Sequence, residues 1–520
     1  YAVATSIALL PLIILALLHL CQAANILVVF PFPSKSHSLL GNGIVKNLLE
    51  AGHQVTYMTS FPRKDTVPNL REVDITDLIN LKVILDDKLS AMDMMAFFKI
   101  MMNLSTLTFE NPNVQELMNN PNEVFDLVIV EWMFAEVYSG FSVVFNCPYI
   151  WLSSVEPHWM VTKLIDERLN PAYHGNAQST NLPPFSFFQR VQELGVALVI
   201  IYLYYTLYNF SLLTPYEKAT YEKYFGPVVE KKGRQLPPYD EVVHNASLML
   251  GNSHVSLGQA TRLPQNYIPI GGYHIDKEVK PMSPELQQLL DNSKNGFIYF
   301  SMGSNIKSKD MPDKLKESML KMFATLKYTI LWKFEEQLTN LPSNVHILEW
   351  APQHAILSHP KCLLFITHGG LLSTTETVHF GVPIIGIPVF ADQFINVERA
   401  VKRGIAKRVD LSYDMAGKLK EAIEEIVRES RYREKVKELS LIYHDRVVPP
   451  ARELVHWVEH VVRTRGAPHL RSPAILVPWY QKLYLDLLAL IIAGIYVVKY
   501  ICKKIFCSKR KNVSKNKKNK

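Results

Sequence analysis

Short apolar runs alternate with helix-like segments through the first half of the chain. The run Asn25–Phe30 is followed by a loop, by a helical pattern and by a strand-like segment at residues 53–60. A strand, a helix and a second strand in this order form the βαβ unit of a parallel sheet. Further strand-like runs at 125–130 and 148–153 continue the pattern, which predicts an N-terminal α/β domain over residues 24–265.

The same alternation restarts in the second half of the chain. Five apolar runs are separated by helical patterns, which predicts a second doubly wound sheet in a C-terminal domain over residues 266–465. The polar, proline-containing segment 258–272 is the predicted linker. The five strand-like runs are 296–304, 328–334, 345–350, Cys362–Thr367 and 383–388.

Three other apolar segments need separate interpretations. Residues 7–23 look like a secretory signal peptide that ends near Ala23, so residues 1–23 are predicted to be a signal peptide that precedes the first domain. An uncleaved membrane anchor is the alternative. Residues 483–501 approach the roughly 20 residues that cross a bilayer, so we expect a transmembrane helix after a juxtamembrane segment, 466–482; a buried core helix is the alternative.

The third segment, residues 196–210, is aromatic and apolar but short for a span. A core helix and a lipid-facing patch are the favoured interpretations, and a lining for an apolar ligand stays open.

The charge of the chain is concentrated at its carboxyl end. The formal net charge is +8, but the stretch from Lys499 to Lys520 holds ten lysines or arginines and no acidic residue. The rest of the chain is therefore close to neutral, which excludes a basic nucleic-acid-binding surface spread over the domains. Basic residues after a span mark its cytosolic side, so residues 502–520 are predicted to be a cytosolic tail and the two domains to be luminal.

Sorting and modification signals agree with this topology. Lys517 and Lys518 resemble the di-lysine retrieval signal of endoplasmic-reticulum membrane proteins, so we expect a single-pass type I protein of that membrane. Asn103, Asn209 and Asn245 begin Asn-x-Ser sequons in the predicted luminal part and are candidate glycosylation sites. Five cysteines form neither a disulfide scaffold nor a metal-binding cluster.

A turn after the predicted strand Cys362–Thr367 carries the most informative chemistry. His368 and two glycines, ending at Gly370, connect this strand to a predicted helix. Glycines allow a ligand to approach the backbone closely, and the N–H groups at a helix start attract phosphate. His368 and Ser373 are therefore placed to hydrogen-bond a diphosphate, and Glu376, further along the helix, to accept from ribose hydroxyls.

Two residue pairs flank this turn. Trp350 is placed to stack on a base whose edge Gln353 reads, and Asp392 with Gln393 offers acceptors for the hydroxyls of a sugar. The glycines are not a strand-linked G-x-G-x-x-G, which disfavours a dinucleotide cofactor. Taken singly, each feature has a structural alternative: Trp350 in the core, Glu376 on a solvated helix face, the glycines as a tight turn. It is their joint spacing that is improbable by chance.

The run from Trp350-Ala351-Pro352-Gln353 to Asp392-Gln393 resembles the donor-binding signature of the UDP-glycosyltransferase family. The resemblance extends over essentially the whole chain, and residues 457–474, the Pro-Trp-Tyr-Gln at 478–481 and the basic tail are similar to membrane-bound animal members, particularly the insect type. It implies the GT-B fold, in which two Rossmann-like domains face a cleft, and inverting transfer of a sugar from a UDP-sugar. The N-terminal domain would bind the acceptor and the C-terminal domain the donor.

The resemblance also implies roles for individual residues. Trp350 would stack on uracil and Gln353 would bond to it, and Glu376 would hold the ribose. Arg262, in the linker, is an open candidate for a sugar or phosphate contact, and Leu372 departs from the asparagine of vertebrate members. The remaining implied donor contacts are Ser304, His368, Gly370 and Ser373 for the diphosphate and Asp392 and Gln393 for the sugar.

His37, just past the first predicted strand, is the expected catalytic base. In the resembled family this histidine takes the proton from the acceptor hydroxyl, a task suited to an imidazole titrating near neutral pH. An aspartate orients it in the family, and Glu131 stands at the corresponding position here. Helix capping by His37, a solvated strand end for Glu131, and Asp126 as the fallback carboxylate are the alternatives.

These expectations converge on one function. We expect an inverting transferase that moves a hexose from UDP-glucose, or secondarily UDP-glucuronate, to a hydroxyl of a small lipophilic acceptor. No D-x-D sequence occurs, so we expect no metal and no cofactor, with helix starts and His368 stabilising the leaving diphosphate. A membrane-tethered UDP-sugar-binding protein without turnover is the rival. A dedicated lipid or pigment acceptor, and the oligomeric state including a homo-oligomer, stay open.

Overall fold

The computed structural model describes most of the chain beyond the predicted signal peptide. The described residues are 23–79, 94–166, 170, 172, 179, 181–182, 184–203, 213–304, 306, 308–482 and 484–518, so residues 1–22, Asn209 and the last two residues lie outside them. The chain divides into one large unit that ends at Arg471 and a second unit, Ser472–Lys520.

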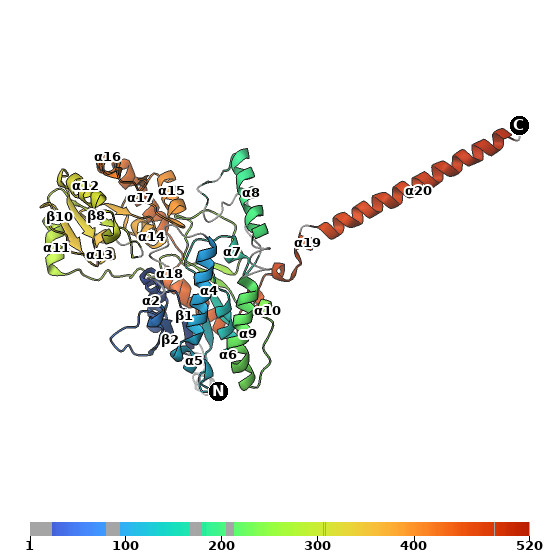
Figure 1. Cartoon of the computed structure of the whole chain (residues 1–520), viewed down its shortest axis with the longest axis horizontal. Helices are drawn as coiled ribbons and strands as arrows, with labels where there is room; N and C mark the ends of the chain where they lie inside the picture. Colours follow the sequence, from blue (N-terminus) through green and yellow to red (C-terminus); the bar gives the residue numbers. More distant parts are fainter. Residues whose placement is uncertain are drawn as a thin grey trace, which may run out of the picture. The chain divides into compact units, whose positions relative to one another are not determined.

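The first lobe of the large unit is built on a seven-stranded parallel sheet of order β3-β2-β1-β4-β5-β6-β7. Figure 1 labels two of its strands, β1 and β2, near the helices α2 and α5. The order reverses between β1 and β4, which is the switch point of a doubly wound sheet. The strands are β1 Asn25–Phe30, β2 Gln54–Thr59, β3 Leu70–Asp74, β4 Leu127–Trp132, β5 Tyr149–Ser153, β6 Met249–Gly251 and β7 Tyr267–Pro269.

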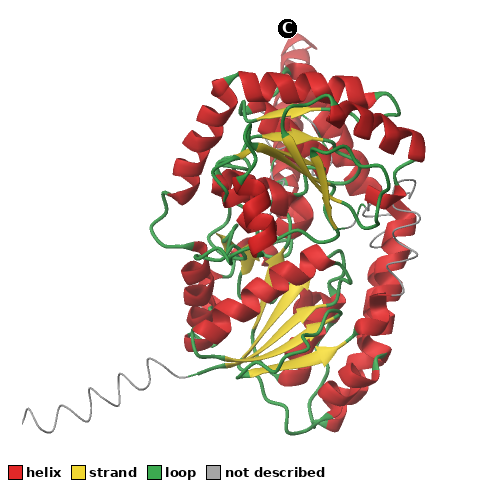
Figure 2. Ribbon diagram, turned by 90° about the vertical axis from the view of Figure 1, so that its left-hand side faces the viewer, coloured by secondary structure: helices red, strands yellow, loops and turns green. Residues whose placement is uncertain are grey.

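Helices cover both faces of this sheet (Figure 2), so its strands are apolar on both sides. Alternate residues of β1 lie in separate core clusters: Leu27 and Val29 in one, Ile26 and Val28 in the other. The helices are α2 Lys35–Glu50, α4 Met94–Glu110, α5 Pro112–Asn119, α6 Gly140–Phe145, α7 Trp159–Thr162, α8 Phe187–Leu203, α9 Leu213–Lys231 and α10 Tyr239–Val243, with 3-10 turns η1 Thr76–Leu78 and η2 Val137–Ser139.

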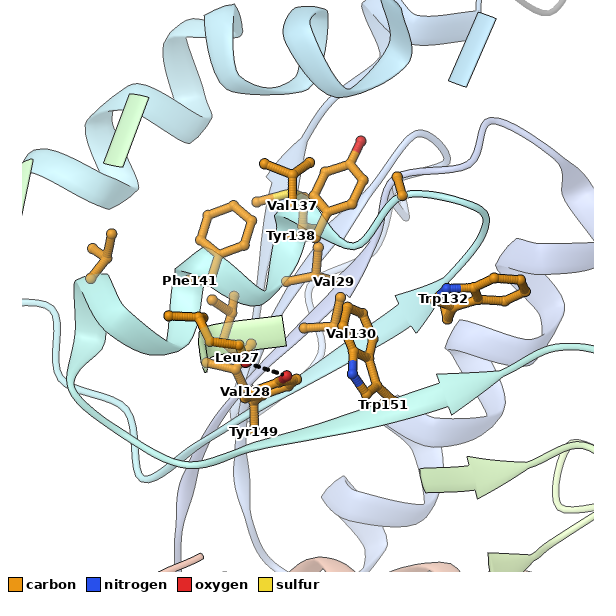
Figure 3. Packing of buried hydrophobic residues seen from close by; sticks show 14 of the residues in the cluster. Leu27, Val29, Val128, Val130, Trp132, Val137, Tyr138, Phe141, Tyr149 and Trp151 are labelled. Atoms are coloured by element: carbon orange, nitrogen blue, oxygen red, sulfur yellow. Dashed lines mark hydrogen bonds between the residues drawn. The ribbon is translucent and has the colours of Figure 1, made fainter. Parts of the chain in front are cut away.

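Aromatic side chains fill one side of the first lobe. Trp151 and Tyr149 of β5 pack with Val128 and Val130 of the neighbouring β4, under Phe141 of α6 (Figure 3). The Tyr149 hydroxyl donates to the backbone carbonyls at 242 and 243 at 2.7 and 2.8 Å, so this buried phenol is satisfied.

The second lobe has a six-stranded parallel sheet of order β10-β9-β8-β11-β12-β13. Two doubly wound α/β lobes are thus present, as predicted. The strands are β8 Phe297–Ser301, β9 Thr329–Lys333, β10 Val345–Leu348, β11 Cys362–Thr367, β12 Ile384–Gly386 and β13 Ala406–Arg408. The helices after β7 are α11 Pro284–Asp291, α12 Asp313–Ala324, α13 Gln353–Ser358, α14 Leu371–Phe380, α15 Gln393–Lys402, α16 Met415–Arg428, α17 Ser430–His444 and α18 Pro450–Arg463, with 3-10 turns η4 Ser308–Asp310 and η5 Pro468–Leu470.

The division between the lobes differs from the predicted one, residues 24–265 and 266–465, at both ends. β7 pairs with β6 and completes the first sheet, so the first lobe continues past residue 265 into the predicted linker. The chain also returns to the first lobe at α18, where Leu454 and Val458 lie in the same buried cluster as β1 and α2. The apolar face of α18 finds its partner there, which no local pattern reveals.

Helix α8 contains the beginning of the aromatic apolar segment 196–210. Its side chains are largely in solvent: Phe188 is 80% exposed, and Leu198 and Val199 are each 56% exposed. The core-helix interpretation is therefore wrong for the part of this segment whose side chains are described.

The second unit contains η6 Pro473–Leu476, α19 Trp479–Lys482 and the long helix α20 Leu485–Lys518. Residues Leu485–Lys504 are long and apolar enough to cross a membrane, and none of that stretch is buried in protein. The predicted span, 483–501, overlaps this stretch closely.

Two predicted glycosylation sites are accessible. Asn103 is exposed on α4, and Asn245 is exposed just after α10. Their modification stays a prediction.

A buried carboxyl group links three elements of the first lobe. Glu217 of α9 accepts from the backbone N–H of Glu136 at 2.8 Å and from the Tyr239 hydroxyl at 2.9 Å. Burial, followed by the nearby Glu136 carboxylate, raises the pKa of Glu217 to about 8. The folded chain therefore keeps a proton there that the unfolded chain releases at an ordinary pKa of 4.5.

This shift predicts a pH-dependent stability. The contribution of protonated Glu217 is complete below about pH 4.5 and is lost as the pH rises through about 8. We expect Glu217→Gln to remove this loss, so the melting temperature of the wild type should fall relative to the variant as the pH is raised through this range. Differential scanning fluorimetry at several pH values measures it, and parallel curves for the two proteins would contradict the assignment.

Candidate active site

The site is built on the carboxyl ends of the strands in both lobes. The loops after β1, β4 and β5 supply its first-lobe residues, and those after β8 to β12 supply the rest. In parallel sheets these loops gather at one edge, next to the starts of helices. We call the region where the two edges meet the interlobe junction; Lys35 of α2 and Trp350 after β10 touch across it, with the Lys35 Nζ 4.6 Å from the centre of the indole ring.

His37 lies in the first turn of α2, whose N-cap is Ser34. It is therefore inside the helix, and the capping alternative is wrong. Its ring packs edge-on against Phe32, with 4.7 Å between ring centres, and its side chain is 14% exposed. A helix start and an aromatic neighbour thus fix the imidazole while leaving part of it accessible.

Glu131 is completely buried near the end of β4, so a solvated strand end is excluded. Its Oε1 contacts His37 Nδ1 and accepts a hydrogen bond from the Ser154 hydroxyl at 2.5 Å. With Nδ1 held by the carboxylate, Nε2 is the nitrogen available to accept a proton. The fallback carboxylate, Asp126, lies just before β4, at the end opposite Glu131, and accepts a hydrogen bond from the backbone N–H of Asn25 at 2.8 Å.

The turn between β11 and α14 holds His368 between two glycines. A Cβ atom at Gly303 would lie 2.5 Å from the imidazole, and one at Gly370 would lie 2.6 Å from it. Gly369 has φ of +85°, and a side chain there would collide with Val397. The glycines are thus required by close packing around His368. Burial, followed by Lys333, lowers the pKa of His368 to about 4, so the ring is neutral at physiological pH.

Glu376 of α14 is buried, which excludes a solvated helix face. Its Oε2 accepts from the Gln353 amide, and its Oε1 lies 3.1 Å from His354 Nε2 and 3.4 Å from His274 Nε2. Burial alone would raise the pKa of Glu376, but the two histidines outweigh it and hold the pKa well below the usual range. The same contact raises the pKa of His354 against the effect of burial.

The side chain of Gln353, at the start of α13, forms hydrogen bonds with three other side chains. Its amide nitrogen contacts Glu376 and lies 3.4 Å from the Ser373 hydroxyl, and its oxygen accepts from the Tyr299 hydroxyl at 3.1 Å. The structure thus brings Gln353, Ser373 and Glu376 together as one hydrogen-bonded group.

Trp350 is 51% exposed, so the core alternative is wrong. Besides Lys35, the Lys333 ammonium lies 5.7 Å from the centre of its ring. Lys333 ends β9, is 7% exposed and donates to Glu335 at 2.5 Å. A buried cation near both Trp350 and His368 suits a site for a negatively charged ligand.

Asp392 and Gln393 are positioned by the start of α15. Both backbone N–H groups at 389 and 390 donate to Gln393 Oε1, at 2.9 and 3.1 Å, which leaves its amide N–H groups for other partners. Asn396 donates to Asp392 at 2.9 Å and to the Gly369 carbonyl at 3.2 Å. Burial raises the pKa of Asp392, and Asn396 and then the imidazole of His37 oppose the rise.

Three further positions from the sequence analysis, Arg262, Ser304 and Leu372, do not belong to the hydrogen-bonded groups described above. Arg262 is exposed between β6 and β7, and within the described part of the chain it makes no hydrogen bond or ion pair. Ser304 is half-buried beside Gly303, next to the turn that holds His368. Leu372 packs against the first-lobe core, so this departure from the vertebrate asparagine serves contact between the lobes.

Several residues of the site escaped sequence reasoning. The contacts of Ser154, His274 and His354 depend on long-range folding, and nothing in their local spacing marks them. Lys333 and Asn396 could have been proposed from sequence. Lys333 lies at the end of a strand and Asn396 lies in the first turn of a helix, and both positions belong to the edge of the sheet where ligands bind.

Comparisons with known proteins agree over nearly the full length. A family model described as UDP-glucoronosyl and UDP-glucosyl transferase matches residues 25–520. UDP-glucosyltransferase 2 of Dactylopius coccus is 34% identical, covering 97% of this chain and 99% of that protein. UDP-glucuronosyltransferase 2B15 of Homo sapiens is 35% identical over 49% of each chain. The solved structure of the glycotransferase of kitacinnamycin covers 84% of this chain and 99% of its own, with a TM-score of 0.54 and 18% identity, a match in GT-B fold.

Proposed function

Because the chain belongs to the UDP-glucoronosyl and UDP-glucosyl transferase family and is a glycosyltransferase, we propose that it transfers glucose from UDP-glucose to a hydroxyl of a small lipophilic acceptor, with inversion. The observation that carries the proposal is the contact of His37 in the first lobe with the buried carboxylate of Glu131, while Asp392 stands at the start of α15 in the second lobe. A proton acceptor and a candidate sugar-binding carboxylate thus come from opposite lobes.

His37 performs the proton transfer in this proposal. Its Nε2 takes the proton from the acceptor hydroxyl, and the resulting nucleophilic oxygen attacks the anomeric carbon from the side opposite UDP. The bond between that carbon and the diphosphate oxygen breaks, and UDP leaves with the electron pair. Glu131 holds the ring through Nδ1 and stabilises the imidazolium that forms.

The second lobe holds the donor and stabilises the leaving group. Trp350 stacks on uracil, and Glu376 accepts from the ribose. The start of α14, neutral His368 and the Lys333 cation lie where negative charge develops on the diphosphate. These groups supply the stabilisation that a divalent ion gives in other glycosyltransferases, so the proposed reaction needs no metal.

The donor is proposed from similarity over the full length. The relative covered along 99% of its length is called a glucosyltransferase, whereas the glucuronosyltransferase match covers about half of each chain. Anchoring through α20, with the catalytic lobes in the endoplasmic-reticulum lumen, completes the proposal and would give membrane-dissolved acceptors access to the enzyme.

Parallel assays test donor and reaction together. The purified full chain is incubated with one phenolic acceptor and either UDP-glucose or UDP-glucuronate, with and without chelator, and products are identified by mass spectrometry. We expect the glucoside as the main product, of inverted anomeric configuration, with turnover retained in chelator. Glucuronide as the main product would overturn the donor choice, and retention of configuration would overturn the mechanism.

A further inference from the structure

Three potential metal ligands converge beside the proposed ribose site. One potential ligand atom from each of His274, His354 and Glu376 lies within 4.8 Å of the other two. Both histidines approach the same carboxylate oxygen, at 3.4 and 3.1 Å, while Gln353 occupies the other oxygen. Neighbouring ligands of a tetrahedral zinc ion lie about 3.4 Å apart, given bonds of about 2.1 Å. The two distances from histidine to carboxylate therefore match the spacing of ligands around one ion, and the third pair of ligand atoms lies within 4.8 Å.

His274 provides independent support for a ligand. Its side chain is 2% exposed, and within the described part of the chain neither ring nitrogen forms a hydrogen bond. Among the described residues, its one ion-pair contact is the 3.4 Å approach of Nε2 to Glu376, which is long for a hydrogen bond. Such an imidazole is costly to bury, because it has lost its bonds to water without fully replacing them. Coordination of Nε2 to a cation would satisfy one of these nitrogens.

The surroundings hold His274 in this position. The backbone of residues 273 and 274 runs against α2: Asn47 donates to the Tyr273 carbonyl at 3.0 Å, and a Cβ atom at Gly43 would lie 2.9 Å from the His274 Cα. His354 and Glu376 belong to α13 and α14 of the second lobe. One ligand thus comes from the segment that follows the first sheet, and two come from the second lobe.

We propose that Zn²⁺, or a divalent transition-metal ion of similar preference, binds His274, His354 and Glu376 and thereby competes with the UDP-sugar. Two neutral imidazoles and one carboxylate form a common three-residue zinc set that leaves a fourth position open. This proposal rests on the proposed function, because competition requires that Glu376 be the acceptor for the ribose hydroxyls. The ion is inhibitory and takes no part in sugar transfer.

The first test is direct binding of Zn²⁺ to the purified, metal-stripped full chain by titration calorimetry. His354 is 28% exposed, so His354→Ala should fold, and the melting temperature checks this. We expect His354→Ala to weaken zinc binding by about 100-fold or more. Mutation of residues that only support a metal ligand typically costs about 10- to 100-fold in affinity, and His354 is proposed to be a ligand itself. The matched control is His469→Ala, which removes the exposed contact of His469 with His460 at 3.1 Å and should leave this zinc affinity unchanged.

Co²⁺ provides a second measurement, because a tetrahedral site gives visible absorption bands that His354→Ala should abolish. If His354→Ala leaves the zinc affinity unchanged, or if His469→Ala abolishes it, the proposed site is wrong.

The second test is competition. UDP-glucose at 100 times its own Kd should weaken apparent zinc binding by about 100-fold. An unchanged zinc affinity in protein that demonstrably binds UDP-glucose would overturn the competition while leaving the proposed function intact. If the metal-free chain fails to bind UDP-glucose at all, the proposed function fails, and the His354→Ala comparison still decides the metal site separately.

Discussion

Replacing His37 by alanine should lower kcat/KM for transfer to a phenolic acceptor by about 10²- to 10⁴-fold, the usual contribution of a general base. The Kd for UDP-glucose should stay nearly constant, because the donor contacts proposed here come from the second lobe. Initial rates at several acceptor concentrations, with calorimetry for the donor, separate the two effects. His469→Ala, a change at an exposed histidine, is the control and should keep wild-type rates.

Glu131 offers a finer test of the same pair. Glu131→Gln removes the charge that stabilises the imidazolium and should also shift the pH dependence of kcat/KM, whereas Glu131→Asp keeps the charge and should recover part of the rate. If His37→Ala turns over like the wild type, His37 is not the base.

Replacing Glu376 by alanine should weaken UDP-glucose binding by about 100-fold. Two hydrogen bonds from ribose hydroxyls to a carboxylate would be lost, each of about 1.5 kcal/mol or more, and about 1.4 kcal/mol corresponds to tenfold in Kd. Glu349→Ala is the matched control, because Glu349 is an exposed carboxylate beside Trp350. Equal donor affinity in both variants would remove Glu376 from the donor site.

The regular part of the fold could be predicted from sequence because its strands are buried on both faces. Runs such as Asn25–Phe30 and Cys362–Thr367 are apolar at all but one terminal residue, which is typical of central strands in parallel sheets. Strands of only three residues, such as β6, β7 and β13, are too short to show a pattern. The return of α18 to the first lobe is a long-range contact that periodicity does not encode.

The same distinction holds for the site. Residues in the segments that follow strands, such as His37, His368 and Asp392, could be proposed from sequence because parallel topology gathers strand ends at one edge. The partners of Glu376 could not be predicted, since His274 is 102 residues away from it and reaches it only through the path of the chain after β7. The sequence predicted a ribose contact for Glu376, which stays a prediction, and it gave no sign of the two histidines beside the carboxylate.

Titration of UDP into the purified full chain tests the central claim most directly, namely that the second lobe binds a uridine nucleotide at the interlobe junction. The account predicts saturable binding of one UDP per chain, strongly weakened in Trp350→Ala and Glu376→Ala but retained in His37→Ala. Absence of binding to the folded wild-type chain, or equal binding by all three variants, would contradict it.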